Sequence, residues 1–191
     1  MITAILLAAG QSKRLKNGNK LIKLFKKKLL INHILSSLIK SKVNKIIIVL
    51  GFEHLKVKKK LLKSKKIKFV INKNYKKGIS SSIKTGLRSL SKNNKGFLIV
   101  QGDMPNISKT TINKIILLIN KSGKEIFLPR FKNRIGNPIG FKKSMIKNIN
   151  KIKGDRGAKN ILKKNNKKIK FVNINSKSIL TNFNTKKDFS S

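Results

Sequence analysis

The sequence lacks cysteine and tryptophan altogether, and it holds only three prolines and five acidic residues in 191 positions. Without cysteine, a disulfide framework, a thiolate nucleophile and a cysteine-ligated metal are all excluded. No apolar run approaches the ~20 residues that a membrane-spanning helix requires, and the chain starts without the basic segment that opens a signal peptide. We therefore expect a cytoplasmic protein that has no membrane partner.

The scarcity of acidic residues leaves a formal net charge of +43, because lysine and arginine together number 48. A charge of this size is the first indication of nucleic-acid binding. Only five of these residues are arginine, however, and the lysines are spread from one end of the chain to the other. Nucleic-acid sites concentrate arginine and aromatic side chains, so a compositional drift towards lysine explains the charge better than a selected nucleic-acid surface. Either origin predicts non-specific binding of nucleic acid at low salt.

Short apolar runs recur along the chain, and polar residues or glycine bound each of them. They indicate strands of a sheet that is covered on both faces, and they occupy residues 2–7, 46–50, 68–71, 97–100, 126–128 and 171–174. Apolar residues between the runs recur at helical spacing, as do Ile112, Ile115, Ile116 and Ile119. Strands that alternate with helices form right-handed βαβ units. The sequence therefore predicts one α/β domain over residues 1–191, a three-layer αβα Rossmann-like fold with a mainly parallel, mixed sheet.

The loops that follow the apolar runs are where chemistry is expected, because ligands of open α/β sheets bind at the carboxyl ends of the strands. Small residues directly after the first run allow backbone N–H groups to approach an anion. Ser12, Arg14 and Lys20 add a hydroxyl group and two cations to this loop. We therefore predict a phosphate-binding loop, although it is neither a Walker A loop nor a dinucleotide-binding fingerprint.

Five short strings, taken together and in order, carry a family resemblance. They are Leu7-Ala8-Ala9-Gly10-Gln11-Ser12-Lys13-Arg14-Leu15 with Lys20, then Gly78-Ile79-Ser80-Ser81-Ser82-Ile83, Gly102-Asp103-Met104-Pro105, Gly136-Asn137-Pro138-Ile139 and Gly154-Asp155-Arg156-Gly157-Ala158-Lys159. Over residues 3–189 the chain resembles the nucleotidyltransferases with a MobA-like fold, which use a nucleoside triphosphate and Mg²⁺. The first and third strings are most similar to those of the molybdenum cofactor cytidylyltransferases.

The resemblance implies a reaction and its partners. A cytidylyltransferase of this group transfers CMP from CTP to the molybdopterin-bound molybdenum cofactor and releases pyrophosphate, and a molybdoenzyme would receive the product. The nucleophile is a phosphate, so no general base is needed. That agrees with His33 and His54, which we interpret as structural residues because one lies in an apolar helical segment and the other directly after a strand.

The resemblance also implies roles for individual residues. Arg14, Lys20 and Asp103 would be catalytic, with the two cations neutralising the triphosphate and Asp103 holding Mg²⁺, a metal that prefers oxygen ligands. Ser108 is better placed than Asp103 to cap the following helix. The nucleotide-binding residues would be Leu7, Ala8, Ala9, Gly10, Ser12, Arg14, Lys20, Gly78, Ser82 and Gly102. The acceptor-binding residues would be Asn137, Pro138, Asp155, Gly157, Asn182 and Asn184.

Two features leave alternatives open. Residues 182–189 read N-F-N-T-K-K-D-F, where the cytidylyltransferases usually have D-x-D-T-P-[ED]-D and the guanylyltransferases resemble this chain with N-x-N-T, so GTP or another phosphorylated acceptor remains possible. Asp155 is also a plain candidate for a helix N-cap. A hypothesis of a different class is a basic nucleic-acid-binding protein on a Rossmann-like scaffold that has lost catalysis.

Overall fold

The computed structural model describes residues 1–12, 18–155 and 159–189. Within them the main sheet has eight strands in the order β10-β7-β9-β6-β1-β4-β5, with β8 paired to β7, and a small hairpin joins β2 to β3. The strands are β1 (Ile2–Ala8), β2 (Leu24–Phe25), β3 (Lys28–Leu29), β4 (Lys45–Leu50), β5 (Ile67–Ile71), β6 (Gly96–Gln101), β7 (Ile126–Phe131), β8 (Arg134–Ile135), β9 (Ile139–Lys142) and β10 (Ile169–Asn173).

The sheet is mixed but mainly parallel, as the sequence predicts. Strands β6, β1, β4 and β5 run parallel to one another, and β10 runs parallel to β7. Strand β9 is antiparallel to both of its neighbours, β6 and β7. Each of the six apolar runs forms a strand, whereas β8 and β9 were not predicted, because β9 is short and a glycine interrupts its apolar pattern.

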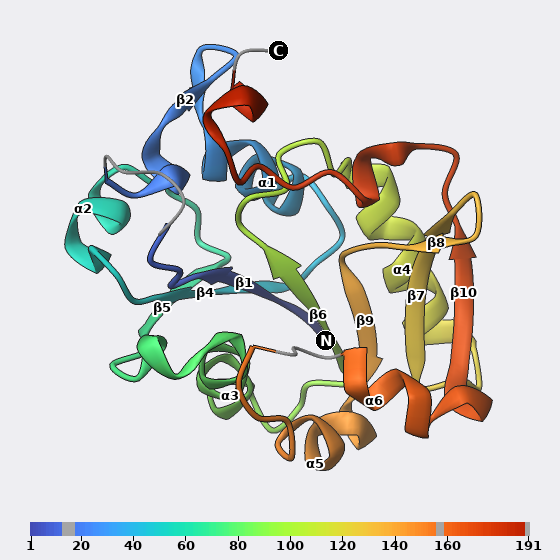
Figure 1. Ribbon diagram of the computed structural model, residues 1–191. Coiled ribbons are helices and arrows are strands. Elements are labelled where there is room, and N and C mark those ends of the chain that lie inside the picture. Colours follow the sequence, from blue (N-terminus) through green and yellow to red (C-terminus); the bar gives the residue numbers. More distant parts are fainter. Residues whose placement is uncertain (13–17, 156–158, 190–191) are drawn as a thin grey trace.

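Helices cover both faces of the sheet, and α1 and α3 lie on opposite sides of β1 and β4 (Figure 1). The helices α1, α2 and α4 pack in one apolar cluster, and α3, α5 and α6 pack in the other. Their bounds are α1 (Leu30–Ile39), α2 (His54–Lys59), α3 (Ile79–Arg88), α4 (Lys109–Lys121), α5 (Ile146–Ile149) and α6 (Lys159–Lys164), with 3-10 turns at η1 (Lys20–Ile22), η2 (Tyr75–Lys77), η3 (Lys143–Met145), η4 (Asn166–Lys168), η5 (Lys177–Ile179) and η6 (Lys186–Phe189).

The alternation of side chains along β1 explains why a continuous apolar run suits this position. Leu6 and Ala8 face the cluster of α1 and α4, whereas Ile5 and Leu7 face that of α3. Both faces are therefore dry, and every residue of β1 is buried. The observed fold is the predicted three-layer α/β Rossmann-like architecture. Within the described part of the chain, no helix is long and apolar enough to cross a lipid bilayer.

The parallel strands bring several loops to one edge of the sheet. The carboxyl ends of β1, β4, β5 and β6 meet there, and the chain then enters η1, α2, η2 and α4. The antiparallel strand β9 begins at the same edge, because it runs opposite to β6. Residues that are far apart in sequence therefore meet at this edge.

Candidate active site

A cavity of about 450 Å³ opens at the carboxyl ends of β1 and β6. Its walls come from the loop after β1, from η1, from η2 with the start of α3, and from the loop after β6. Eight of the residues predicted to bind the nucleotide line it, namely Leu7, Ala9, Gly10, Ser12, Lys20, Gly78, Ser82 and Gly102. Ala8 lies outside the lining, because its side chain faces the buried cluster of α1. Arg14 lies outside the residues that the structure describes.

The charged centre of the cavity is an ion pair between Lys20 and Asp103. The Lys20 Nζ lies 2.5 Å from Asp103 Oδ2, and each side chain is only 15% exposed. The same ammonium group donates hydrogen bonds to Asn184 Oδ1 and to the Phe183 carbonyl oxygen, both at 2.9 Å. Three oxygens from two distant parts of the chain therefore surround one cation.

Local hydrogen bonds fix where Lys20 starts. The backbone N–H of Lys20 donates to Ser12 Oγ at 3.0 Å, and the Asn19 side chain caps η1 by accepting from Leu21 N. The Asn19 amide also donates to the Phe52 carbonyl at 3.2 Å. These bonds tie the start of η1 to the loops after β1 and β4, so Ser12 serves as a support for Lys20.

Asp103 is placed by the end of β6. The Gly102 N–H donates to the Leu7 carbonyl at 3.0 Å, and a Cβ at this position would lie 2.9 Å from that same oxygen. A side chain at residue 102 would therefore separate the two strand ends. Asp103 does not cap α4, because Ser108 Oγ accepts the Thr111 N–H at 3.1 Å, which confirms the prediction for Ser108.

Asp155 forms part of the opposite wall and caps a helix from another region of the chain. Its Oδ1 accepts the N–H of Ile79, the first residue of α3, at 3.1 Å, and the Gly154 carbonyl accepts from Ser80 N. Gly78 has φ +94° in this contact, and a Cβ there would lie 2.5 Å from Asp155 Oδ1. The carboxylate thus satisfies an N–H group at the start of α3 and interacts favourably with its dipole.

The residues predicted to bind the acceptor are divided by the structure. Asp155 and Asn184 line the cavity, whereas Asn137, Pro138 and Asn182 do not. The Asn137 N–H donates to the Ile179 carbonyl, Pro138 is buried and Asn182 is exposed. Gly157 lies outside the described residues.

Six further residues line the cavity and were not predicted. Gln11 and Ile79 belong to the quoted strings but had no assigned role, Leu21 and Gln101 adjoin Lys20 and Gly102, and Tyr75 and Lys76 precede Gly78 by three and two positions. The best signal was Tyr75, the single tyrosine of the chain. Its ring lies 6.4 Å from that of Phe52, between centroids.

The C-terminal segment is held over Lys20 by Asp188. Its Oδ2 accepts the N–H groups of Asn184 and Thr185, both at 2.7 Å, and the Thr185 hydroxyl at 3.0 Å. These bonds hold the pKa of Asp188 below its ordinary value of 3.8. The bond from the Thr185 backbone has the largest effect, and the bond from the Asn184 backbone has the next largest. Asp188 is therefore an anionic anchor for Asn184.

The hollow at the carboxyl end of a mainly parallel sheet, with an ammonium group and a carboxylate at its centre, is the arrangement of a nucleotide-using enzyme of the Rossmann-like class. The family model of the MobA-like NTP transferase domain matches residues 4–169, so this chain belongs to that family and is a nucleotidyltransferase. The predicted family and the predicted class of enzyme are thereby confirmed.

Solved structures share the whole fold at low sequence identity. Rv0371c from Mycobacterium tuberculosis is 20% identical with a TM-score of 0.87, over 99% of this chain and 95% of that one. Its complex with manganese is 18% identical with a TM-score of 0.81, over 99% and 96%. A nucleotidyl transferase from Methanothermobacter thermautotrophicus is 19% identical with a TM-score of 0.84, over 100% and 94%. A 4-diphosphocytidyl-2C-methyl-D-erythritol synthase from Anaerococcus prevotii is 17% identical with a TM-score of 0.79, over 99% and 92%.

Proposed function

We propose that this nucleotidyltransferase transfers CMP from CTP to the molybdopterin-bound molybdenum cofactor and releases pyrophosphate. The observation that carries the chemistry is the Lys20–Asp103 pair at the base of the cavity. The choice of CTP is supported by the strings around Ala8-Ala9-Gly10 and Gly102-Asp103-Met104-Pro105, and by the structural relative whose name carries a cytidyl group. The choice of acceptor is supported by the resemblance of the same strings.

The site suits substrates that carry several negative charges. Its volume lies within the usual range for small-molecule pockets, and Lys20 and Lys76 contribute ammonium groups to its lining. An oxygen of the acceptor phosphate would attack the α-phosphorus, and the bond from that phosphorus to pyrophosphate would break. The chain has to align the two substrates and offset their charge repulsion, which is the main task in phosphoryl-type transfer. We assign Arg14 to the same task from the sequence.

The oxygens that surround the Lys20 ammonium group already bind one cation, and they are suited to bind a divalent metal. Asp103 would hold Mg²⁺ together with the Asn184 side-chain oxygen, and these are ligand types that Mg²⁺ prefers. When bound, the metal would neutralise charge on the triphosphate. A relative of the same fold is known as a manganese complex, which supports a divalent ion here.

For the acceptor, we favour the part of the cavity between Asp155 and Asn184, because these two line it from opposite sides of the sheet edge. Asn137, Pro138, Gly157 and Asn182 stay in the proposal only as acceptor-binding residues that the family resemblance implies. We also propose that residues 1–191 act as one domain in the cytoplasm, that a molybdoenzyme receives the product, and that nucleic acid binds non-specifically at low salt.

The first experiment measures pyrophosphate release in Mg²⁺ with molybdenum-loaded molybdopterin, with CTP and GTP offered in parallel at a salt concentration that strips nucleic acid. Acceptor-dependent release with CTP is expected. Asp103→Ala should lower the rate by at least about a hundredfold, since charge stabilisation at the reacting phosphate is lost. Glu125→Ala is the matched control, because Glu125 also pairs with a lysine but lies outside the cavity lining.

The result with GTP decides between the two nucleotides. Release with GTP alone would keep the mechanism and overturn the cytidylyl assignment, which the N-x-N-T string at residues 182–185 makes the nearest alternative. Absence of release with both nucleotides, from folded protein, would contradict the proposed acceptor.

A further inference from the structure

Lys20 occupies a position that is built like a cation site. Its Nζ is held by a carboxylate oxygen of Asp103, a side-chain amide oxygen of Asn184 and the peptide oxygen of Phe183, at 2.5, 2.9 and 2.9 Å. Carboxylate, amide and peptide oxygens are the ligand types that hard divalent cations take in proteins. The ammonium group therefore stands where a metal ion would find its oxygens.

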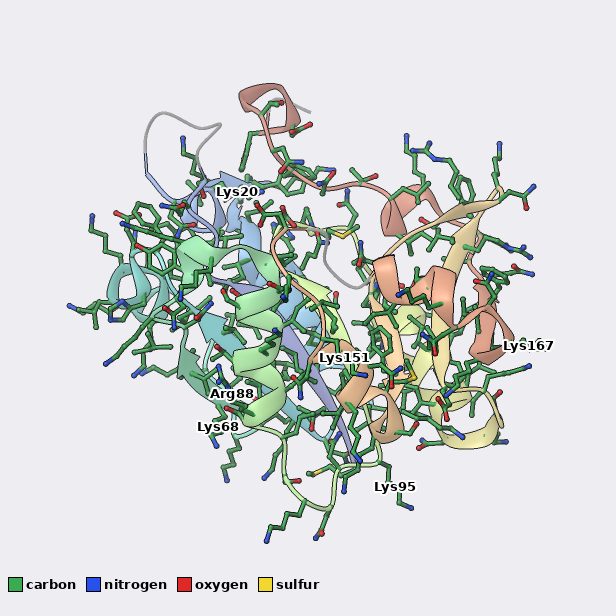
Figure 2. The ribbon with its side chains drawn as sticks, turned by 60° about the horizontal axis from the view of Figure 1, so that its bottom comes forward. Lys20, Lys68, Arg88, Lys95, Lys151 and Lys167 are labelled. Carbon is green, nitrogen blue, oxygen red and sulfur yellow. The ribbon has the colours of Figure 1, made fainter. Side chains whose placement is uncertain are left out.

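Figure 2 compares the placement of Lys20 with that of other labelled lysines. Lys95 and Lys167 extend outward from the surface of the molecule, whereas Lys20 lies among the ribbon segments beside the C-terminal segment. Only 15% of its side chain is exposed, whereas most of the described lysines are exposed. Burial of an ammonium group is costly unless it is paired, so the three acceptors are what keep Lys20 in place.

The backbone segments that carry the oxygens around Lys20 are held by bonds that do not involve Lys20. The Phe183 N–H donates to the Asp103 carbonyl at 2.9 Å, and Asp188 holds the backbone of Asn184 and Thr185. The buried Phe183 ring packs edge-on against Phe25, with 4.6 Å between the centroids. The backbone that carries the three acceptors is therefore held without a contribution from Lys20.

We propose that Lys20 is a placeholder for the divalent metal in the nucleotide-free enzyme, so that the ammonium group and the ion exclude each other from the same oxygens. The proposal rests on the proposed function only for the use of a divalent metal. A single carboxylate cannot neutralise two adjacent cations, and the described residues contain no group of three or more potential metal-ligating His, Cys, Asp or Glu side chains. The negative charge that lets both cations stay must come from the triphosphate.

Lys20 also lines the nucleotide cavity, so a displaced ammonium group remains beside the phosphates. Its release from Asp103 then supplies the cation that the triphosphate needs. The free protein consequently binds the metal weakly, and the metal and nucleotide bind with positive coupling. The coupling arises because the metal can bind only after the Lys20 ammonium group has left Asp103, and the nucleoside triphosphate attracts that ammonium group.

The consequence is counterintuitive for a lysine in the reaction machinery. Lys20→Met removes the competing charge and keeps a side chain of similar length, so it should tighten Mn²⁺ binding to the nucleotide-free protein by about tenfold, the scale of one charge-assisted hydrogen bond. The same variant should lose transferase activity. A residue that only assisted the metal would show weaker binding when removed.

The test is a titration with Mn²⁺ alone, followed by the electron paramagnetic resonance signal of the free ion, at fixed ionic strength. Lys76→Met is the matched control, because Lys76 is exposed and lines the same cavity, and it reports how much any lost positive charge favours the ion. Tighter binding in Lys20→Met than in both wild type and Lys76→Met supports the proposal. Mn²⁺ binding by Lys20→Met that is equal to or weaker than in these two proteins overturns it. The proposal is also overturned if adding Asp103→Ala to Lys20→Met leaves Mn²⁺ binding unchanged.

A second measurement uses the unaltered protein and remains decisive if Lys20→Met folds poorly. An amine-acylating reagent is applied with and without saturating Mn²⁺, and modification at Lys20 and Lys76 is compared by peptide mass spectrometry. Lys20 should become more reactive when Mn²⁺ binds, while Lys76 stays unchanged. No change at Lys20, or greater protection, contradicts the exclusion of one cation by the other.

These measurements need no acceptor and no turnover. If pyrophosphate release fails with molybdopterin but Lys20→Met binds Mn²⁺ more tightly, the acceptor assignment is wrong and the placeholder role stands. If release occurs as proposed but Mn²⁺ binding is indifferent to Lys20, the function stands and the placeholder role is wrong.

Discussion

Some residues of this enzyme contribute charged side chains to the cavity, whereas others shape it because they have no side chain. Gly78 belongs to the second kind, because it has φ +94° and its α-carbon faces Asp155. A left-handed backbone is strained for a residue with a side chain. The contact also places the capping carboxylate on α3, so both the turn and the helix start depend on this glycine.

Gly78→Ala should therefore lower the free energy of unfolding by about 1–3 kcal/mol, from backbone strain and displacement of the Asp155 carboxylate. Urea unfolding measures the difference. Gly123→Ala is the control, since Gly123 has open space around its α-carbon and its φ lies outside the left-handed range. Equal stability of the two variants would contradict this, because it would mean that the Asp155 carboxylate can move away from an added Cβ at residue 78 without a cost in stability.

The sequence reaches the reacting residues only in part. Lys20 and Asp103 were predicted from short strings that resemble a family, and the structure places them in one ion pair although 83 positions separate them. The role of Asp155 as a cap for α3 was not predicted, because the helix start it serves lies 76 positions earlier in the chain. Local sequence patterns predict the order of strands, helices and loops along the chain. Polar contacts between residues that are far apart in sequence arise only when the sheet has assembled.

At the scale of elements, the turn from Phe183 to Phe189 acts as an arm that reaches back to the β6 end. Apolar runs predicted the central strands well, because a strand buried on both faces is apolar throughout. The arm has no such signal. Its order comes from Asp188 and from the Phe183 ring, which is 4% exposed.

The lowered pKa of Asp188 gives the arm a pH dependence. Because the folded pKa lies below the unfolded value near 3.8, the charged carboxylate adds stability at neutral pH, and that stability is lost as the pH falls through the folded pKa. Asp188→Asn should be less stable than wild type at pH 7, and this difference should shrink as the pH falls below 3.8.

Thermal unfolding across this pH range checks the effect on the arm. Asn182→Ala is the control, because Asn182 is an exposed neutral residue of the same segment. Its difference from wild type should not change with pH. A constant difference for Asp188→Asn as well would mean that the hydrogen bonds of Asp188 do not depend on its charge.

For the whole molecule, the dominant feature is a net charge of +43, because only five acidic residues offset 48 lysines and arginines. Within the described residues, Glu53, Asp103 and Glu125 pair with lysines, and Asp155 and Asp188 accept backbone N–H groups. All five acids therefore have a structural partner. Most lysines face solvent without a carboxylate, so the folded chain repels itself.

Added salt should consequently stabilise the fold. Between about 0.02 M and 0.5 M NaCl the Debye length falls severalfold, which screens the lysine repulsion more than it weakens the few ion pairs. The melting temperature should rise by several degrees over this range in scanning fluorimetry. A fall would mean that the three ion pairs outweigh the repulsion among the other lysines.

The C-terminal arm has a consequence for a chain that is cut short. Phe183 and Asn184 supply two of the three oxygens around the Lys20 ammonium group, and Asp188 holds the backbone of Asn184. The strands that end near Lys20 and Asp103, and the last strand β10, all precede the arm in the sequence. A premature stop codon between β10 and Phe183 would therefore leave the strands of the sheet present and the reaction centre incomplete.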